Sequence, residues 1–105
     1  EGAATLTEEI FGPCAHIAPF DTDEQALSLC RDDRYGLASV IWTSDKSRAA
    51  TLTSRLNTGM VWVNTWLERD LEFPFGGMRQ SGVGREGGIH SIDFHTDAKY
   101  VVEKF

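Results

Sequence analysis

Apolar and polar positions alternate along the first two thirds of the chain in a way that predicts strands separated by helices. Three short apolar runs, residues 14–20, 37–43 and 60–63, predict strands, although His16 and Pro19 make the first one irregular. Between these runs, apolar residues recur at helical spacing. Strands that alternate with helices are typical of an α/β fold, so the pattern predicts a βαβαβ order around a parallel sheet.

The first predicted helix begins at a capping box. Thr22 is the expected N-cap, and Gln25 stands three residues later, where its side chain can reach back. The helix is expected to end near Asp32 and Asp33. Its apolar stripe, in which Cys30 is expected to be a buried and reduced packing residue, consists of Ala26, Leu27, Leu29 and Cys30.

The second helix is predicted between the next two strands. Thr43 or Ser44 is the expected cap, and Asp45 is favourably placed at the positive end of the helix. Gly59 fits the exit from the same helix. The inner face of this helix is expected to consist of Ala49, Ala50, Leu52 and Leu56.

No sustained periodicity follows between residues 64 and 96. Aromatic residues in this stretch argue against disorder, and long segments without regular structure are commonly functional. We therefore expect a long ordered loop that lies against something outside this chain, with glycines at 76, 77, 82, 84, 87 and 88. Residues 100–105 then give a last strand signal, separate from the sheet.

Composition narrows the functional classes. The formal net charge is −6 and the basic residues are scattered, which argues against a nucleic-acid-binding surface. No apolar run reaches the ~20 residues that a membrane-spanning helix needs. The 3 histidines and 2 cysteines show no metal-ligand spacing, so no metal site is expected. So few cysteines also indicate a reducing compartment, and therefore the cytoplasm.

The first residues, Glu1 to Ala4, have no initiator methionine and none of the regions of a signal peptide. They are typical of the interior of a longer chain, with a trimmed N-terminus as the alternative.

Two motifs carry candidate chemistry. Residues 82–87 match G-x-G-x-x-G, but a lone match is weak, because the dinucleotide fingerprint must follow a strand and open a helix. A loop that needs glycine conformations is the favoured alternative. Cys14 is a lone cysteine, and no His or Asp stands at a spacing that suggests the base a thiol nucleophile requires.

Arg69 lies in the segment that directly follows the third predicted strand. Loops at the carboxyl ends of strands are where α/β folds bind ligands. A guanidinium fork suits a carboxylate, so Arg69 is a candidate carboxylate-binding residue. The alternative is a local ion pair with Asp70 or Glu72.

Several segments, in order and spacing, resemble the aldehyde dehydrogenase superfamily. The resemblance covers residues 8–105, and it implies that residues 1–98 are the C-terminal portion of the catalytic domain. It also implies that residues 99–105 form the terminal strand of an oligomerisation sheet. The segments are Glu8 to Pro13, Tyr35 to Ala38, Gly59 to Asn64, and Pro74 to Gly77 followed by Ser81 to Glu86.

The resemblance implies roles for particular residues. Glu9 matches the glutamate that binds the nicotinamide ribose hydroxyls of NAD, or of NADP, and Phe11 matches the aromatic residue beside the nicotinamide. Phe75 matches a residue near the substrate tunnel. The wall of the aldehyde pocket is matched by Trp62, Asn64 and the loop after them, including Trp66.

Residues 64–71 and 84–91 look most like the 2-hydroxymuconic and 2-aminomuconic semialdehyde dehydrogenase branch, which oxidises dicarboxylate-type semialdehydes in aromatic catabolism. Arg69 then matches an arginine expected to hold the substrate carboxylate. One departure is Glu72, an acid where related sequences often carry a basic residue, because a nearby acid weakens anion binding.

Catalytic residues are expected to be absent from this chain. The family's nucleophilic cysteine, general-base glutamate, oxyanion-hole asparagine and NAD-binding domain all precede the region resembled, and neither Cys14 nor Cys30 matches the nucleophile motif. We expect cofactor and pocket contacts within a longer NAD-dependent enzyme, a homodimer or homotetramer, and no activity alone. The alternatives are a stand-alone binding or assembly module and a minimal enzyme that uses Cys14.

Overall fold

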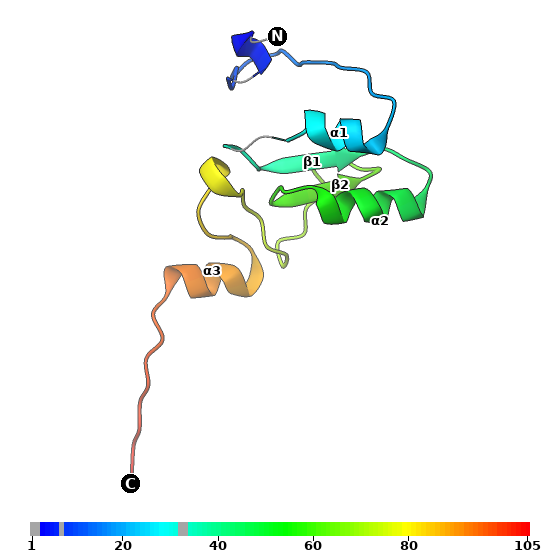
Figure 1. Cartoon of the computed structure of the whole chain (residues 1–105). Coiled ribbons are helices and arrows are strands. Elements are labelled where there is room, and N and C mark those ends of the chain that lie inside the picture. Colours follow the sequence, from blue (N-terminus) through cyan, green and yellow to red (C-terminus); the bar gives the residue numbers. More distant parts are fainter. Residues whose placement is uncertain (1–2, 7, 32–33) are drawn as a thin grey trace.

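The computed structural model describes residues 3–6, 8–31 and 34–105. Its elements follow the order of an α/β unit, with a short 3₁₀ turn before and another after it (Figure 1). They are η1 (Ala4–Leu6), α1 (Asp23–Leu29), β1 (Ala38–Ile41), α2 (Lys46–Arg55), β2 (Met60–Val63), η2 (Arg79–Ser81) and α3 (Gly88–His95).

The two strands form a parallel sheet, as predicted. Ala38 is paired with Met60 and Ile41 with Val63, so the strands run in register from end to end. The crossover between them is α2, and α1 and α2 run alongside the strands (Figure 1). Both strands therefore end at the same edge of the sheet, where the chain leaves β2 at Asn64.

The first predicted strand is not formed. Residues 14–20 are extended, yet in the described part of the chain they belong to no strand. A strand requires the backbone groups of a neighbour, and the apolar pattern of this run does not supply one. The expected βαβαβ order is therefore reduced to αβαβ, which is followed by α3 (Gly88–His95) in the described residues.

The predicted N-cap of α1 is confirmed, with one difference in detail. Thr22 Oγ1 accepts a hydrogen bond from the amide of Gln25 at 3.2 Å. The Gln25 side chain reaches back to the amide of Asp21 at 2.8 Å, one residue earlier than in a standard capping box. The helix ends at Leu29, and the expected end at Asp32 and Asp33 lies outside the described residues.

The prediction that Cys30 is buried is wrong. Cys30 is the C-cap of α1 and is exposed, because the stripe to which it belongs borders an open hollow instead of a closed core. Cys14 is exposed as well.

Asp45, and not Thr43 or Ser44, caps α2. The Asp45 carboxylate accepts from the amides of Ser47 and Arg48 at 2.9 and 3.0 Å. Thr43 Oγ1 accepts from the amide of Asp45 and so supports the turn before the helix. A carboxylate satisfies two free amides at the positive end of a helix, which favours Asp45 over a hydroxyl.

The inner face of α2 is narrower than expected. Ala49 is buried, Leu52 and Leu56 are half-buried, and Ala50 is exposed. The helix ends at Arg55, so Gly59 is not its exit residue. Gly59 instead permits a close approach, because a Cβ there would lie 1.8 Å from the carbonyl oxygen of Gly76.

The glycine-rich segment is ordered, as predicted, but it contains a helix that the sequence pattern did not indicate. α3 opens at Gly87 and Gly88, which have φ values of 98° and 48°. The helix has no side-chain cap at Gly87, so the usual start signal is missing. Its first turn is instead supported by Ser91, whose Oγ accepts from the amide of Gly87 at 2.7 Å.

The last residues extend away from the rest of the chain (Figure 1). Residues 96–105 carry no helix or strand, so the predicted strand at 100–105 has no partner in the described structure. The radius of gyration is 18.6 Å, whereas a compact domain of this length has about 13 Å. Ile41 and Ala49 are the only buried apolar residues of the described part, other than glycine.

Candidate functional site

The candidate site lies in the loop that leaves β2. Asn64 opens this loop with a φ of 55°, a conformation that asparagine tolerates better than most residues. Its side chain joins the ends of the two strands, because Oδ1 accepts from the amide of Thr43 at 2.9 Å and Nδ2 donates to the Thr43 carbonyl at 2.8 Å. The loop therefore starts from a fixed point at the carboxyl edge of the sheet.

Two tryptophans form the first part of the loop. Trp62 and Trp66 meet edge to face, with 5.4 Å between their ring centroids. The indole nitrogen of Trp62 donates to the carbonyl of Glu68 at 2.8 Å, which holds the loop over the strand. Trp66 itself is 60% exposed, so it presents an aromatic surface three residues before Arg69 in the chain.

Arg69 is held by an aromatic ring and a carboxylate. Its Cζ lies 4.0 Å from the centroid of the Phe75 ring, and its Nη2 donates to Glu86 Oε1. The side chains of Arg69 and Glu86 are 40% and 58% exposed. The local ion pair considered from the sequence is therefore wrong as to its partner, since Asp70 instead accepts from the amide of Glu72 at 2.9 Å.

Phe75 and Glu86 are neighbours through their backbones. The amide of Phe75 donates to the Glu86 carbonyl at 2.7 Å, and the amide of Glu86 donates to the Phe75 carbonyl at 2.9 Å. This antiparallel bridge delivers the ring and the carboxylate to the same guanidinium. Sequence reasoning missed Glu86, because the contact joins residues 17 positions apart through an irregular loop.

The glycines of the G-x-G-x-x-G match serve close packing. A Cβ at Gly84 would lie 2.7 Å from the Phe94 ring, and a Cβ at Gly87 would lie 2.2 Å from the Phe73 carbonyl oxygen. The motif follows the 3₁₀ turn η2 and not a strand. These contacts favour the loop interpretation over phosphate binding.

Two other arginines of the loop are occupied by carbonyl groups. Arg79 Nη2 donates to the carbonyls of Tyr35 and Asn57, the latter at 3.1 Å. Arg85 Nη1 donates to the carbonyls of Gly77 and Gly84 at 2.8 and 2.7 Å. Both therefore fasten the loop, and Arg69 differs from them in facing a carboxylate.

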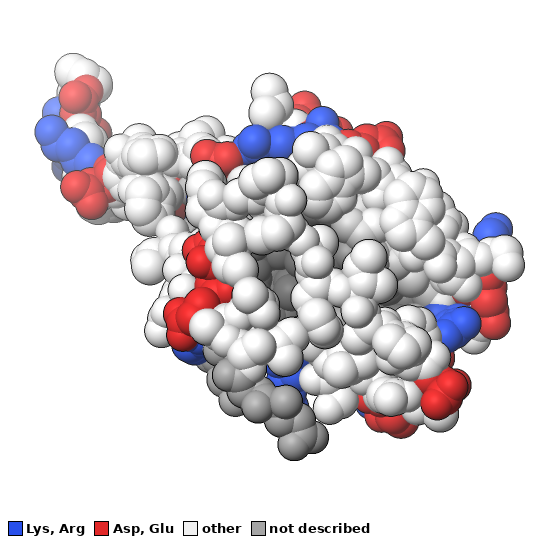
Figure 2. Space-filling model, turned by 90° about the horizontal axis from the view of Figure 1, so that it is seen from above, with Lys and Arg blue, Asp and Glu red and all other residues white. Residues whose placement is uncertain are grey.

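Glu9 and Phe11, the predicted cofactor contacts, lie apart from Arg69. Glu9 borders an open hollow of about 1040 Å³ that lies between the residues before α1 and the elements α1, α2 and β1. Arg69 belongs to a separate, smaller recess of about 710 Å³. Figure 2 shows mainly uncharged residues around this hollow. Phe11 is 98% exposed, so no described residue covers its ring.

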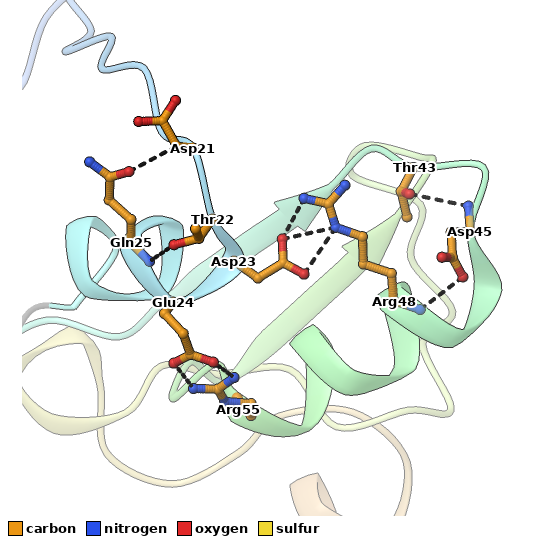
Figure 3. Close-up of polar contacts among 9 residues, drawn as sticks. All are labelled: Asp21, Thr22, Asp23, Glu24, Gln25, Thr43, Asp45, Arg48 and Arg55. Carbon is orange, nitrogen blue, oxygen red and sulfur yellow. Dashed lines mark hydrogen bonds and ion pairs between the residues drawn. The ribbon is translucent and has the colours of Figure 1, made fainter.

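Two ion pairs join α1 to α2 (Figure 3). Arg48 Nε donates to both oxygens of Asp23 at 2.9 and 3.1 Å, and Arg55 contacts Glu24 through two hydrogen bonds of 2.5 Å. The hydrogen bond from Arg55 lowers the pKa of Glu24 below its ordinary value. These exposed pairs set how the helices lie against each other, and we assign them a structural role.

The described residues form neither a cluster of potential metal ligands nor a membrane-spanning helix. Residues 3–6, 8–31 and 34–105 contain no group of three or more His, Cys, Asp or Glu side chains placed to hold an ion. Over the same ranges, no helix has the length and apolar character required to span a membrane.

Comparison with known proteins assigns the chain to a family. The model of the aldehyde dehydrogenase family matches residues 1–101. The chain is 54% identical over 104 residues to 2-hydroxymuconic semialdehyde dehydrogenase of Pseudomonas sp. (strain CF600), covering 99% of this chain and 21% of that protein. It is 45% identical over 104 residues to 2-aminomuconic semialdehyde dehydrogenase of Danio rerio, again with 99% and 21% covered.

A solved structure agrees with this assignment. Indole-3-acetaldehyde dehydrogenase in complex with NAD+ matches with a TM-score of 0.82 and 43% identity, over 89% of this chain and 19% of that one. The chain thus spans about a fifth of the length of the relatives it matches. The extent of the family match and the level of identity together show that the chain belongs to the aldehyde dehydrogenase family.

Proposed function

We propose that this chain works as part of a longer polypeptide, an NAD-dependent aldehyde dehydrogenase that oxidises a semialdehyde to the acid. The chain spans about a fifth of its relatives, and a similar structure contains bound NAD+. In such an enzyme NAD accepts the hydride that leaves the substrate. The rest of the polypeptide would supply the nucleophile and base, and this chain would supply cofactor and substrate contacts.

The substrate that we propose carries a carboxylate as well as an aldehyde. The single observation that carries this proposal is the position of Arg69, half-exposed and stacked on Phe75 in the loop after β2. The resemblance to the aldehyde dehydrogenase family implies substrate-pocket roles for both residues. Two of the relatives bear names of muconic semialdehyde dehydrogenases, which supports the same class of substrate for this chain.

Glu9 and Phe11 are proposed to contact the nicotinamide half of the cofactor. Both side chains are exposed, which leaves them accessible to a ligand. A carboxylate is a suitable acceptor for two ribose hydroxyls, because charged acceptors form short, strong hydrogen bonds. NADP would make the same contacts here, since its extra phosphate lies on the other ribose.

The exposed apolar residues are proposed to be covered by the rest of the enzyme and by other subunits. Large side chains such as Ile17, Trp42 and Tyr100 are 90%, 69% and 90% exposed. Extensive exposed apolar surface marks a binding surface. The extended residues 99–105 suit pairing with a strand elsewhere in a homodimer or homotetramer. The free cysteines Cys14 and Cys30 fit a cytoplasmic location.

Replacement of Arg69 tests the proposed substrate class. In the longer enzyme, Arg69→Ala should lower kcat/KM for a carboxylate-bearing semialdehyde by about 30-fold, which corresponds to roughly 2 kcal/mol. This value is at the low end for truncation of a charge pair, because the Arg69 side chain is 40% exposed to solvent. A neutral aldehyde of the same length should lose little, since it never pairs with the guanidinium. Steady-state kinetics with both substrates gives the substrate ratio, which is kcat/KM for the carboxylate-bearing semialdehyde divided by kcat/KM for the neutral aldehyde.

Two further variants sharpen the comparison. Arg69→Lys should recover only part of the loss, because an ammonium lacks the planar fork. Arg31→Ala, which removes an exposed arginine beyond α1, serves as the control and should leave the ratio unchanged. Equal effects of Arg69→Ala on both substrates would show that Arg69 does not recognise the carboxylate.

A further inference from the structure

The ion pair between Arg69 and Glu86 is a feature that the proposed function does not use. We propose that Glu86 is a positioning residue, which together with Phe75 fixes the Arg69 guanidinium so that its remaining N–H groups receive the substrate carboxylate. Glu86 would then set the preference of the enzyme for carboxylate-bearing aldehydes over neutral ones. This inference rests on the proposed function, because it assumes that Arg69 binds the substrate.

The backbone makes Phe75 and Glu86 a single rigid support. Their two mutual hydrogen bonds, 2.7 and 2.9 Å, fix the ring and the carboxylate relative to each other. The ring lies 4.0 Å from Arg69 Cζ, and the carboxylate takes the Nη2 end of the same group. A guanidinium that is held on a face and at one end has little freedom to rotate.

The contact with Glu86 leaves most of the guanidinium donors available. Arginine has five N–H donors, and the hydrogen bond to Glu86 involves Nη2 alone. Among the described residues no other acceptor is within hydrogen-bond distance of Arg69. A substrate carboxylate can therefore bind at Nη1 or Nε without displacing Glu86.

The neighbouring acids explain why Arg69 needs a fixed partner. Asp70 and Glu72 are close to Arg69 in the chain, and either could draw a free guanidinium away from the Phe75 ring. An unrestrained arginine also loses more rotamer entropy when it binds a ligand. Glu86 prevents both effects, so its removal should weaken carboxylate binding even though it removes a negative charge from the site.

Glu86→Gln in the longer enzyme tests this role. The amide keeps the size of the side chain and leaves the backbone bridge intact, but it loses the charge that holds Arg69. We expect KM for the carboxylate-bearing semialdehyde to rise by about three- to tenfold, with little change in kcat. A rise of this size is expected when a partly exposed ion pair that orders a ligand-binding side chain is lost. KM for the neutral aldehyde should not change.

Matched variants separate positioning from general effects of charge. Glu86→Asp keeps the charge on a shorter side chain and should restore part of the affinity. Asp93→Asn removes an exposed charge from α3 and should leave both KM values unchanged. The double variant Arg69→Ala with Glu86→Gln should be no worse than Arg69→Ala, because the two residues act through one interaction.

The outcomes distinguish failure of this inference from failure of the proposed function. If Arg69→Ala lowers the substrate ratio and Glu86→Gln does not, Arg69 binds the carboxylate without help and Glu86 has no positioning role. A lower KM for the carboxylate substrate in Glu86→Gln would make Glu86 a competitor, which also overturns the inference. An unchanged ratio in Arg69→Ala would overturn the proposed substrate class itself.

Discussion

Arginine residues in this chain differ in which groups contact their guanidinium groups. Arg79 donates to backbone carbonyls outside the loop, and Arg85 donates to carbonyls inside it. Arg48 and Arg55 are paired with carboxylates across a helix–helix contact. Arg69 alone among these rests on an aromatic ring beside an ion pair that uses one of its nitrogens. That combination of restraint and free donors suits a ligand carboxylate.

Glu9 is the second residue whose role can be tested singly. In the longer enzyme, Glu9→Gln should raise KM for NAD and lower kcat, because an amide keeps the size but loses the charge-assisted acceptors for the ribose hydroxyls. Thermal melting should change little, since Glu9 is exposed. Glu8→Gln, at the adjacent exposed acid, is the control. An unchanged rate with a lowered melting temperature would identify Glu9 as structural.

α2 connects the two strands, and its start depends on one side chain. Asp45→Ala leaves the amides of Ser47 and Arg48 without their acceptor and should cost about 1 kcal/mol of local stability. Hydrogen exchange of α2 amides in the longer enzyme should then be about fivefold faster. Asp21→Ala, an acid that caps no helix amide with its side chain, should leave exchange unchanged. Equal protection in both variants would show that packing, and not the cap, holds the helix start.

Local sequence signals predict those helices and strands that are determined by apolar spacing and by capping residues. The helices α1 and α2 and the parallel strands β1 and β2 follow from apolar spacing and polar caps. Residues 14–20 and 100–105 have strand-like composition, but a strand needs a partner, and composition does not say whether one exists. The helix α3 was missed because glycines open it and no side chain caps it.

At the candidate site, too, features that depend on local sequence could be predicted, and contacts between distant residues could not. Arg69, Trp66 and Phe75 are predicted site residues because their segments match a family pattern, and the segment with Arg69 also follows a strand; their roles stay predictions. The contact between Glu86 and Arg69 could not be predicted, because it depends on the path of a loop with close glycine contacts, such as Gly59 against Gly76. Such contacts join distant residues and leave no periodic trace in the sequence.

On the scale of the whole molecule, the described structure has a small core and an extended shape. Its dimensions are 71 × 34 × 23 Å, and α1 and α2 enclose a hollow with β1 instead of closing over it. Many of its large apolar side chains are exposed. Exposed apolar surface of this extent marks a binding surface. It supports the proposal that the chain works as part of a longer polypeptide.

The most direct test of this account compares the isolated chain with the longer enzyme. NAD reduction is measured with a carboxylate-bearing semialdehyde under identical conditions for both proteins. We expect turnover by the longer enzyme and none by the isolated chain, because the proposed function assigns only cofactor and substrate contacts to this chain. Cys14 and Cys30 are exposed free thiols, and a thiol nucleophile requires a nearby base. NAD-dependent turnover by the isolated chain that persists through purification and disappears in Cys14→Ala would contradict the account.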